Sequence, residues 1–210
     1  MPRTLLIAAL AATALSVTGW WPGHPAPAAA QEAAEPAAEV VEMTLGDADA
    51  PVEVIEYASF TCPHCATFHE SVMPRLKEDY IDTGKVHFIY REVYFDKYGM
   101  WASMIARCGG EPRFFGITDL VYESQSDWAR AGSDVAVADE LRKIGRLAGL
   151  ESDQIEACLS DADKLRALVG WYQQNATEHD ITSTPSFVID GETFSNMGYE
   201  AFAEVLDEKL

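Results

Sequence analysis

Two cysteines separated by two residues have the clearest chemical potential in this sequence. Cys62 and Cys65 enclose Pro63 and His64 in the stretch FTCPHCATFHE. Cysteines at this spacing can hold a metal, form a short structural disulfide, or exchange electrons as a reactive dithiol. The choice among these depends on the compartment, on the neighbouring elements and on the remaining cysteines.

A metal site and an inert disulfide both fit the sequence less well than a redox pair. A structural zinc ion takes four ligands, and the other cysteines, Cys108 and Cys158, are single and lie in helical patterns. A disulfide between residues i and i+3 closes too short a loop to contribute much chain entropy. We therefore favour a redox dithiol and expect no metal, while the two alternatives stay open.

The first residues predict export. Arg3 precedes an apolar run over residues 5–17, and a small-x-small site ends at Ala30, which together resemble a secretory signal peptide spanning residues 1–30. This run of about 13 residues is too short for a membrane anchor, which needs about 20. Residues 31–42 are rich in Ala, Pro and Glu and predict a flexible acidic leader before one domain over residues 43–210.

The charge balance excludes one class of partner. The 210 residues carry 15 Lys and Arg against 34 Asp and Glu, a net charge of −19. A chain this acidic, without a basic cluster, repels the phosphate backbone of nucleic acids. We expect a well-solvated surface and no nucleic-acid partner.

The periodicity alternates between strand and helix around a long helical block. Strands are predicted at 51–59, 85–95, 185–190 and 192–195, and helices at 62–82, with a kink at Pro74, and at 199–210. Residues 97–178 show helical spacing throughout. The sheet can be buried only if the late hairpin joins the first two strands, which predicts an α/β fold with a mixed sheet and an inserted helical subdomain.

The position of the cysteine pair predicts different roles for its two thiols. A strand delivers Cys62 to the start of a helix, where free N–H groups and the helix dipole favour a thiolate. We expect Cys62 to be exposed and to have a low pKa, and we expect the His64 imidazole to be a main cause of this low pKa. Cys65, one turn into the helix, should be shielded and act as the resolving thiol.

Two stretches of the sequence resemble a known family. EYASFTCPHC and STPSFVIDGETFS are similar to the active-site strand-helix and the cis-proline loop of DsbA-like disulfide oxidoreductases of the thioredoxin fold. The resemblance covers residues 43–210, and the block at 97–178 matches the family's helical insertion. It implies that Pro185 is a cis-proline that presents backbone to substrate. The family often has an aliphatic residue at the position of Thr184. Related isomerases have a threonine there, so this residue leaves the choice between oxidase and isomerase open.

The resemblance also implies a role for Glu56. It lies in the first strand on the side of Val52 and Val54, and it resembles the family's buried acid, which passes a proton to Cys65. A solvent-facing glutamate is the alternative. Arg91 or Lys85 on the next strand is the expected counter-charge if Glu56 is buried.

The function implied is that of a periplasmic dithiol oxidase. It would donate its disulfide to reduced exported proteins, be reoxidised by a quinone-linked membrane protein and need no bound cofactor. It is expected to be monomeric, because the short leader leaves no room for the dimerisation domain of the usual isomerases. It is also expected not to be embedded in the membrane. A disulfide isomerase or reductant of the same fold, and a peptide-binding chaperone with idle cysteines, are the alternatives.

The other cysteines and the remaining histidines are assigned to structure. Once Cys62 and Cys65 pair with each other, Cys108 and Cys158 have only each other as partners. We predict that they form a structural disulfide, with two buried thiols as the alternative. His69, His87 and His179 show no ligand spacing and are interpreted as packing or surface residues.

Overall fold

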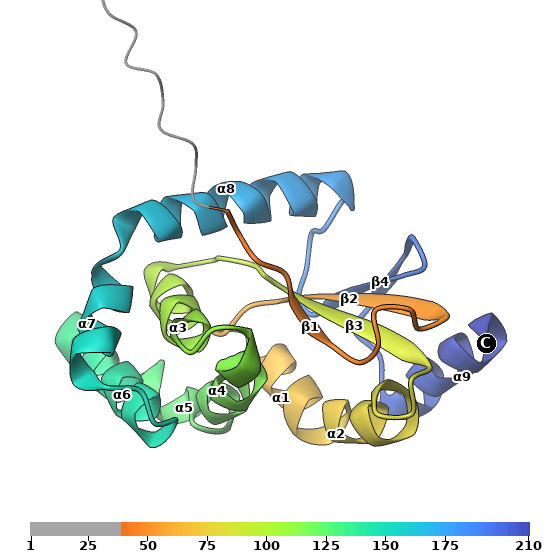
Figure 1. Cartoon of the computed structure of the whole chain (residues 1–210), viewed down its shortest axis with the longest axis horizontal. Coiled ribbons are helices and arrows are strands. Elements are labelled where there is room, and N and C mark those ends of the chain that lie inside the picture. Colours follow the sequence, from red (N-terminus) through yellow and green to blue (C-terminus); the bar gives the residue numbers. More distant parts are fainter. Residues whose placement is uncertain (1–38) are drawn as a thin grey trace, which may run out of the picture. The chain divides into compact units, whose positions relative to one another are not determined.

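A five-stranded mixed sheet forms the centre of the computed structural model, which describes residues 39–210 (Figure 1). The strands lie in the order β1-β3-β2-β4-β5; β2 and β3 run parallel, and the other neighbours are antiparallel. The predicted signal peptide and most of the predicted leader lie outside the described residues. The strands are β1 (Met43–Leu45), β2 (Val52–Ala58), β3 (Val86–Glu92), β4 (Ser186–Ile189) and β5 (Glu192–Ser195).

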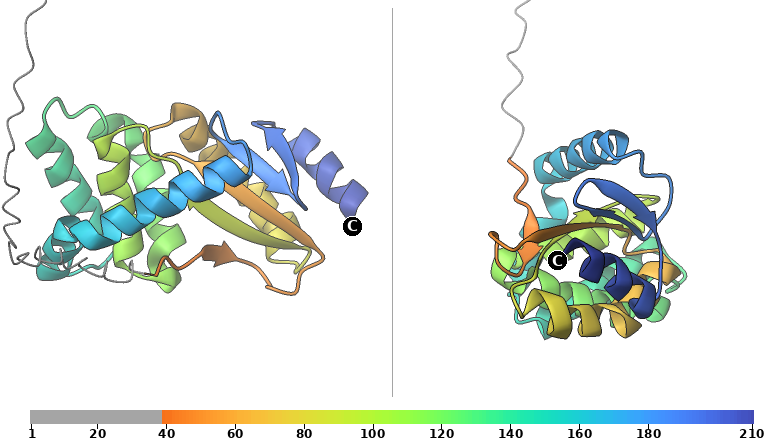
Figure 2. Two further views of the ribbon diagram at one scale, coloured as in Figure 1. Left: turned by 90° about the horizontal axis from the view of Figure 1, so that it is seen from above. Right: turned by 90° about the vertical axis from the view of Figure 1, so that its right-hand side faces the viewer.

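Helices cover both faces of this sheet. One face carries α1 (Pro63–Ser71), α2 (Met73–Leu76), the π-helix η1 (Lys77–Ile81) and the C-terminal α9 (Tyr199–Lys209). The long helix α8 (Ala162–Glu178) crosses the opposite face (Figures 1 and 2). Because β2 is central and has a helix layer on each side, nearly all of its residues are buried.

A helical subdomain is inserted between β3 and β4, as predicted. Its core contains the fully buried side chains of Ile105, Phe114 and Trp128. A buried ion pair ties the subdomain to the sheet, with Arg107 Nη2 donating to Glu92 Oε2 at 2.7 Å. Before α8 the subdomain comprises α3 (Lys97–Cys108), α4 (Glu111–Glu123), α5 (Gln125–Trp128), α6 (Asp134–Leu147) and α7 (Ser152–Ser160).

Local chemistry explains where several elements end. Asp96 accepts hydrogen bonds from the N–H groups of Tyr98 and Gly99 and so caps α3, which takes Val93–Phe95 out of the predicted second strand. The hairpin between β4 and β5 turns at Asp190 and Gly191, with φ of 47° and 82°. Both values lie in the left-handed region that Gly and Asp tolerate best, so the predicted Asp-Gly turn is confirmed.

The folded region begins earlier than the sequence predicts. The carbonyl of Val41 accepts a hydrogen bond from Arg107 at 2.8 Å, and Glu42 forms an ion pair with Arg91 at 2.8 Å. Strand β1 was not predicted and pairs with β3. The last residues of the predicted flexible leader are therefore bound to the domain. The sequence did not reveal this, because their partners on β3 and α3 are distant along the chain.

Candidate functional site

The cysteine pair lies where β2 leads into α1. Cys62 is the N-cap residue of α1, and Pro63 occupies the first turn of the helix. Both cysteines are free in this structure, so the pair is a dithiol. Cys65 is completely buried, and Cys62 is only 8% exposed. The expectation that Cys62 is exposed is wrong, because the loop before β4 covers its sulfur.

Hydrogen bonds give the two thiols opposite acidities. The pKa of Cys62 falls to about 5, chiefly because the Cys65 thiol donates to its thiolate, with further help from the Thr184 side chain and from the backbone N–H groups of Cys65 and His64. Burial opposes this effect. The pKa of Cys65 is raised far above its ordinary value by burial, by its bond to Cys62 and by the charge of Glu56. The pair thus combines one thiolate with one protonated partner.

His64 is exposed and lies on the outer side of the pair. It contributes its backbone N–H to the lowered pKa of Cys62. This contribution comes from the start of the helix rather than from the imidazole. The predicted effect of the imidazole stays a prediction.

The loop before β4 places a cis peptide bond against Cys62. The Thr184–Pro185 bond is cis, and the Thr184 carbonyl lies 3.5 Å from Cys62 Sγ. Pro185 and Thr184 are therefore brought to the cysteine pair from a segment more than a hundred residues later in the chain. An extended peptide that lies along this loop would meet its backbone next to the reactive sulfur.

Glu56 lies beneath the pair and is completely buried. Its Oε2 is 2.9 Å from Nε2 of His69, which is also buried and comes from α1. The ring of Tyr122 stacks on the His69 ring with centroids 4.4 Å apart. The solvent-facing alternative for Glu56 is therefore wrong.

The prediction that Arg91 or Lys85 is the counter-charge of Glu56 is also wrong. Arg91 binds Glu42 at 2.8 Å and the Tyr57 hydroxyl at 2.9 Å, and Lys85 donates to a carbonyl at 3.3 Å. In β3, Tyr90 and not Arg91 pairs with Glu56, and alternate residues of a strand face opposite sides. The interpretation of His69 as a simple packing residue missed its contact with Glu56. The available signal was its spacing of four residues from Cys65, which places both on one helix face.

Gln125 holds the backbone of the active-site loop and was not predicted. Its buried Nε2 donates to the carbonyls of Phe60 at 2.8 Å and Cys62 at 3.0 Å. These bonds connect α5 of the helical subdomain to the loop that carries the reactive sulfur. The inserted subdomain thus helps to position Cys62.

Replacing Gln125 with leucine is expected to lower the free energy of unfolding by about 1–3 kcal/mol, because two buried carbonyls lose their donor. Urea unfolding of the oxidised protein measures this loss. Ser126→Ala, at an exposed position of the same helix, is the matched control and should leave the midpoint unchanged. An unchanged midpoint for Gln125→Leu would show that the loop keeps its shape without these bonds.

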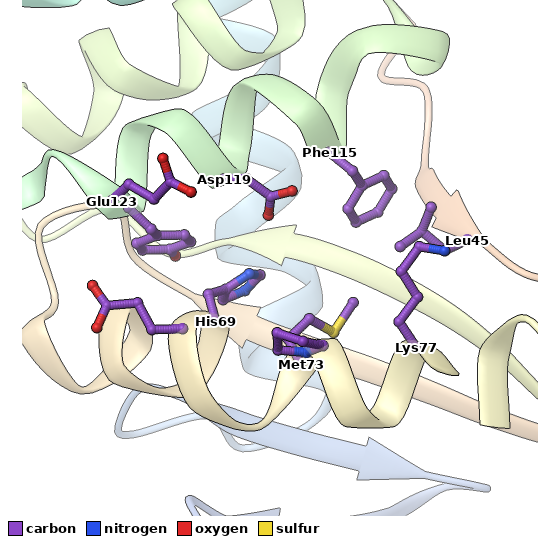
Figure 3. Close-up of a pocket in the computed structure, with 10 residues that line it drawn as sticks. Leu45, His69, Met73, Lys77, Phe115, Asp119 and Glu123 are labelled. Atoms are coloured by element: carbon purple, nitrogen blue, oxygen red, sulfur yellow. The ribbon is translucent and has the colours of Figure 1, made fainter. Parts of the chain in front are cut away.

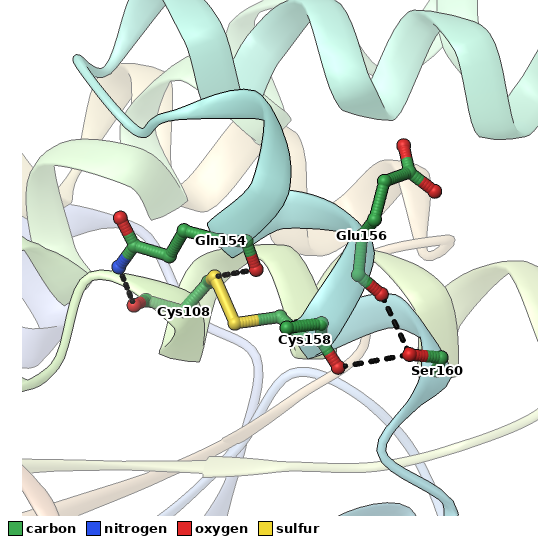
Figure 4. Close-up of a disulfide and its surroundings, with 6 residues drawn as sticks. Cys108, Gln154, Glu156, Cys158 and Ser160 are labelled. Atoms are coloured by element: carbon green, nitrogen blue, oxygen red, sulfur yellow. Dashed lines mark hydrogen bonds between the residues drawn. A yellow bond between two sulfur atoms is a disulfide. The ribbon is translucent and has the colours of Figure 1, made fainter.

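The second pair of cysteines forms a disulfide far from the first. Cys108 at the end of α3 is joined to Cys158 of α7, with the Cα atoms 5.8 Å apart (Figure 4). The Gln154 side chain donates to the carbonyl of Cys108 at 2.9 Å and adds a second link between the same helices. This is the pairing that the cysteine count predicts.

Neither a metal-binding cluster nor a membrane-spanning helix is found in the part of the chain that the structure describes. Residues 39–210 contain no group of three or more His, Cys, Asp or Glu side chains arranged to hold a metal ion. None of their helices is long and apolar enough to cross a membrane.

The fold and the site together define a class of protein. A mixed sheet, a helix that begins at Cys-Pro-His-Cys and a cis-proline loop against the first cysteine form the arrangement of thioredoxin-fold proteins with a redox-active dithiol. The helical insertion after β3 distinguishes a subgroup of that class. The predicted fold class is confirmed.

Comparison with known proteins identifies the subgroup. A family profile described as thioredoxin matches residues 38–208. The crystal structure of Wolbachia pipientis alpha-DsbA1 is 30% identical, superimposes with a TM-score of 0.74, and the match covers 80% of this chain and 89% of that one. The chain belongs to the DsbA-like family of thioredoxin-fold proteins, as its sequence motifs predict.

Curated relatives carry consistent names. A putative protein-disulfide oxidoreductase of Rickettsia bellii is 31% identical over 170 residues, covering 80% of this chain and 64% of the relative. The disulfide bond formation protein D of Bacillus subtilis is 26% identical over 181 residues, with 80% and 77% covered. The chain thus spans less than two thirds of the Rickettsia protein.

Proposed function

We propose that this protein is an exported thiol:disulfide oxidase that donates a Cys62–Cys65 disulfide to reduced substrate proteins. The main support is the asymmetry of the dithiol. Cys62 has a pKa of about 5 and lies against the cis-proline loop, whereas Cys65 is buried and its pKa is raised. A thiol that ionises this readily is a good leaving group, so the enzyme gives up its disulfide easily.

The proposed reaction has two thiol exchanges. A substrate thiolate attacks Cys62 Sγ of the oxidised pair, the Cys62–Cys65 bond breaks, and Cys65 leaves with the bonding electrons and takes up a proton. A second substrate thiolate then attacks the substrate sulfur of the mixed disulfide. Cys62 leaves as a thiolate, which its hydrogen-bond donors stabilise. The substrate loses two electrons and the enzyme gains them.

Specific residues have proposed roles in this cycle. The Thr184–Pro185 loop would receive the substrate backbone beside Cys62, since its carbonyl is already within 3.5 Å of the sulfur. Glu56 would exchange a proton with Cys65, because it is buried beneath the pair and its charge acts on that thiol. Regeneration requires an external electron acceptor, for which we propose a quinone-linked membrane protein.

The equilibrium of the Cys62–Cys65 pair with glutathione redox buffers tests this function. We expect a reduction potential near the oxidising end of the thioredoxin superfamily, roughly −120 mV. The Cys108–Cys158 pair is monitored separately in the same samples by alkylation and peptide mapping. A potential toward about −270 mV would instead assign the protein to the reductants. A Cys62→Ala/Cys65→Ala variant that still promotes folding of a reduced, unfolded substrate as well as the normal protein would favour the chaperone alternative.

A further inference from the structure

The buried pair of Glu56 and His69 has unused hydrogen-bonding capacity. Glu56 Oε2 and His69 Nε2 bind each other, but Glu56 Oε1 and His69 Nδ1 have no partner among residues 39–210. Buried polar atoms are nearly always paired, and an exception calls for an explanation such as a catalytic role, strain or a bound water. The unpaired oxygen and nitrogen lie at opposite ends of a two-residue chain.

One end of this chain faces the cysteine pair. Glu56 is the only carboxylate among the main causes that raise the pKa of Cys65, so it acts on this thiol within the buried layer under α1. Cys65 and His69 lie one helical turn apart on α1, and Glu56 lies on the strand beneath them. Glu56 is therefore the carboxylate that is placed to accept a proton from Cys65.

His69 also lines a cavity near the C-terminal end of α1, whereas Cys62 lies at the N-terminal end of this helix. The cavity has a volume of about 370 Å³ and is lined by residues of α1, α2 and α4. Figure 3 shows His69 in its wall, with Asp119 facing it from α4 and Met73 beside it. Glu70 and Glu123 at the rim are exposed to solvent, so water and protons can reach the cavity.

We infer that His69 is the positioning residue through which protons pass between Glu56 and this cavity, so that Cys65 can exchange a proton without opening the substrate face. The inference rests on the proposed redox function of the pair. It assigns the cavity to proton supply and not to substrate binding. Because Nδ1 is buried, release of a proton to the cavity requires a small movement of the cavity wall.

The groups around His69 are compatible with this role. Burial raises the pKa of Tyr90 and Tyr122 well above the ordinary value, so both phenols stay neutral and do not compete for the proton. Burial raises the pKa of Asp119, and a charged His69 lowers it, so the two groups interact across the cavity. The titratable groups facing His69 are Glu56 of β2, Tyr90 of β3, Asp119 and Tyr122 of α4, and Cys65 of α1, with Glu70, Lys77 and Glu123 at the cavity.

The step to be tested is the resolution of a mixed disulfide between Cys62 and glutathione. The Cys65 thiol gives its proton to Glu56, and the resulting thiolate attacks Cys62 Sγ. The bond to glutathione breaks, and glutathione leaves with the bonding electrons as a thiolate. Glu56, now protonated, donates from Oε2 to the unprotonated Nε2 of the His69 tautomer that carries its proton on Nδ1, and Nδ1 releases that proton to water in the cavity. The mixed disulfide supplies the oxidising equivalents, so no further oxidant is needed.

The experiment measures glutathione release in a single turnover from the preformed adduct of the full chain between about pH 5 and about pH 9. His69→Gln keeps a donor for Glu56 but cannot relay a proton, and we expect release to slow by about 10- to 100-fold. In His69→Ala, added imidazole should enter the enlarged cavity and restore the rate in a saturable way. His87→Gln, on β3 beside Glu53, is the matched control and should release glutathione at the normal rate.

Two further measurements separate this role from a structural one. The pKa of Cys62, followed by thiolate absorbance, should stay near about 5 in His69→Gln, because His69 is not among its main causes. Thermal unfolding shows whether each variant is folded. A His69→Gln variant with the normal rate across the pH range would overturn the relay, as would slow His69→Ala that imidazole does not rescue. Failure of the normal protein itself to release glutathione would instead refute the proposed redox function.

Discussion

The reduced protein is expected to gain about 5 kcal/mol of stability over the oxidised protein as the pH rises from about 5 to about 9. The cause is the Cys62 thiolate, which exists only in the reduced form. Its pKa is about 5 in the folded state against 9.0 for an ordinary cysteine, so the folded state holds fewer protons in this range. Each unit of pKa difference corresponds to about 1.4 kcal/mol.

The sign follows from the depressed pKa. A group with a lowered pKa contributes its full stabilisation above the unfolded value and loses it as the pH falls through the folded value. The advantage of the reduced form is therefore largest near about pH 9, amounts to about 3 kcal/mol at neutral pH and is lost near about pH 5. Cys65, whose pKa is raised, works in the opposite direction only above the ordinary cysteine value.

Urea unfolding of both redox forms at a series of pH values measures this difference. The Cys62→Ala variant, which keeps Cys65, is the control, and its stability should not show the rise between about pH 5 and about pH 9. Parallel curves for the reduced and oxidised normal protein would contradict the low pKa of Cys62. The result bears directly on function, because a stabilised reduced form is what makes a disulfide strongly oxidising.

The parts of the site that depend on local sequence could be predicted. The β-branched run before Cys62, the proline after it and the Asp-Gly turn each have a local physical meaning, and each was found where expected. The positions of Cys62, Cys65 and Pro185 along their elements followed from these signals. Their roles in the cycle remain proposals.

The parts that depend on register between distant segments could not be predicted. Arg91 was expected near Glu56, but in the parallel pairing of β2 and β3 Glu56 is opposite Tyr90. Shifting a strand by one residue reverses which face a side chain occupies, and sequence alone does not determine that shift. Strand β1 was missed for a related reason, because three residues carry too little periodicity to be recognised.

The exposure of Cys62 was predicted wrongly because it depends on a segment far along the chain. A helix N-terminus is ordinarily accessible, and the low pKa suggests contact with water. In the structure the Thr184 carbonyl covers the sulfur, and the donors that stabilise the thiolate belong to the protein. A low thiol pKa therefore does not require exposure when preorganised donors replace water.

Removing the Cys108–Cys158 disulfide is expected to lower the free energy of unfolding by about 4 kcal/mol. The bond closes a loop with a sequence separation of 50 residues, and this restricts the unfolded chain. It also joins α3, which carries the buried Arg107, to α7 of the helical subdomain. Both cysteines must be replaced together, because a single replacement leaves a free thiol that can exchange with the redox pair.

Thermal unfolding of the Cys108→Ala/Cys158→Ala variant, with Cys62 and Cys65 oxidised, measures this effect. For a domain of this size the expected loss corresponds to a midpoint lower by about 8–16 °C. Gln154→Ala is the matched comparison, since it removes only the hydrogen bond to the Cys108 carbonyl and should cost about 1 kcal/mol. A midpoint within about 2 °C of normal would mean that helix packing alone holds α3 and α7 together, because the chain-entropy contribution would then be negligible.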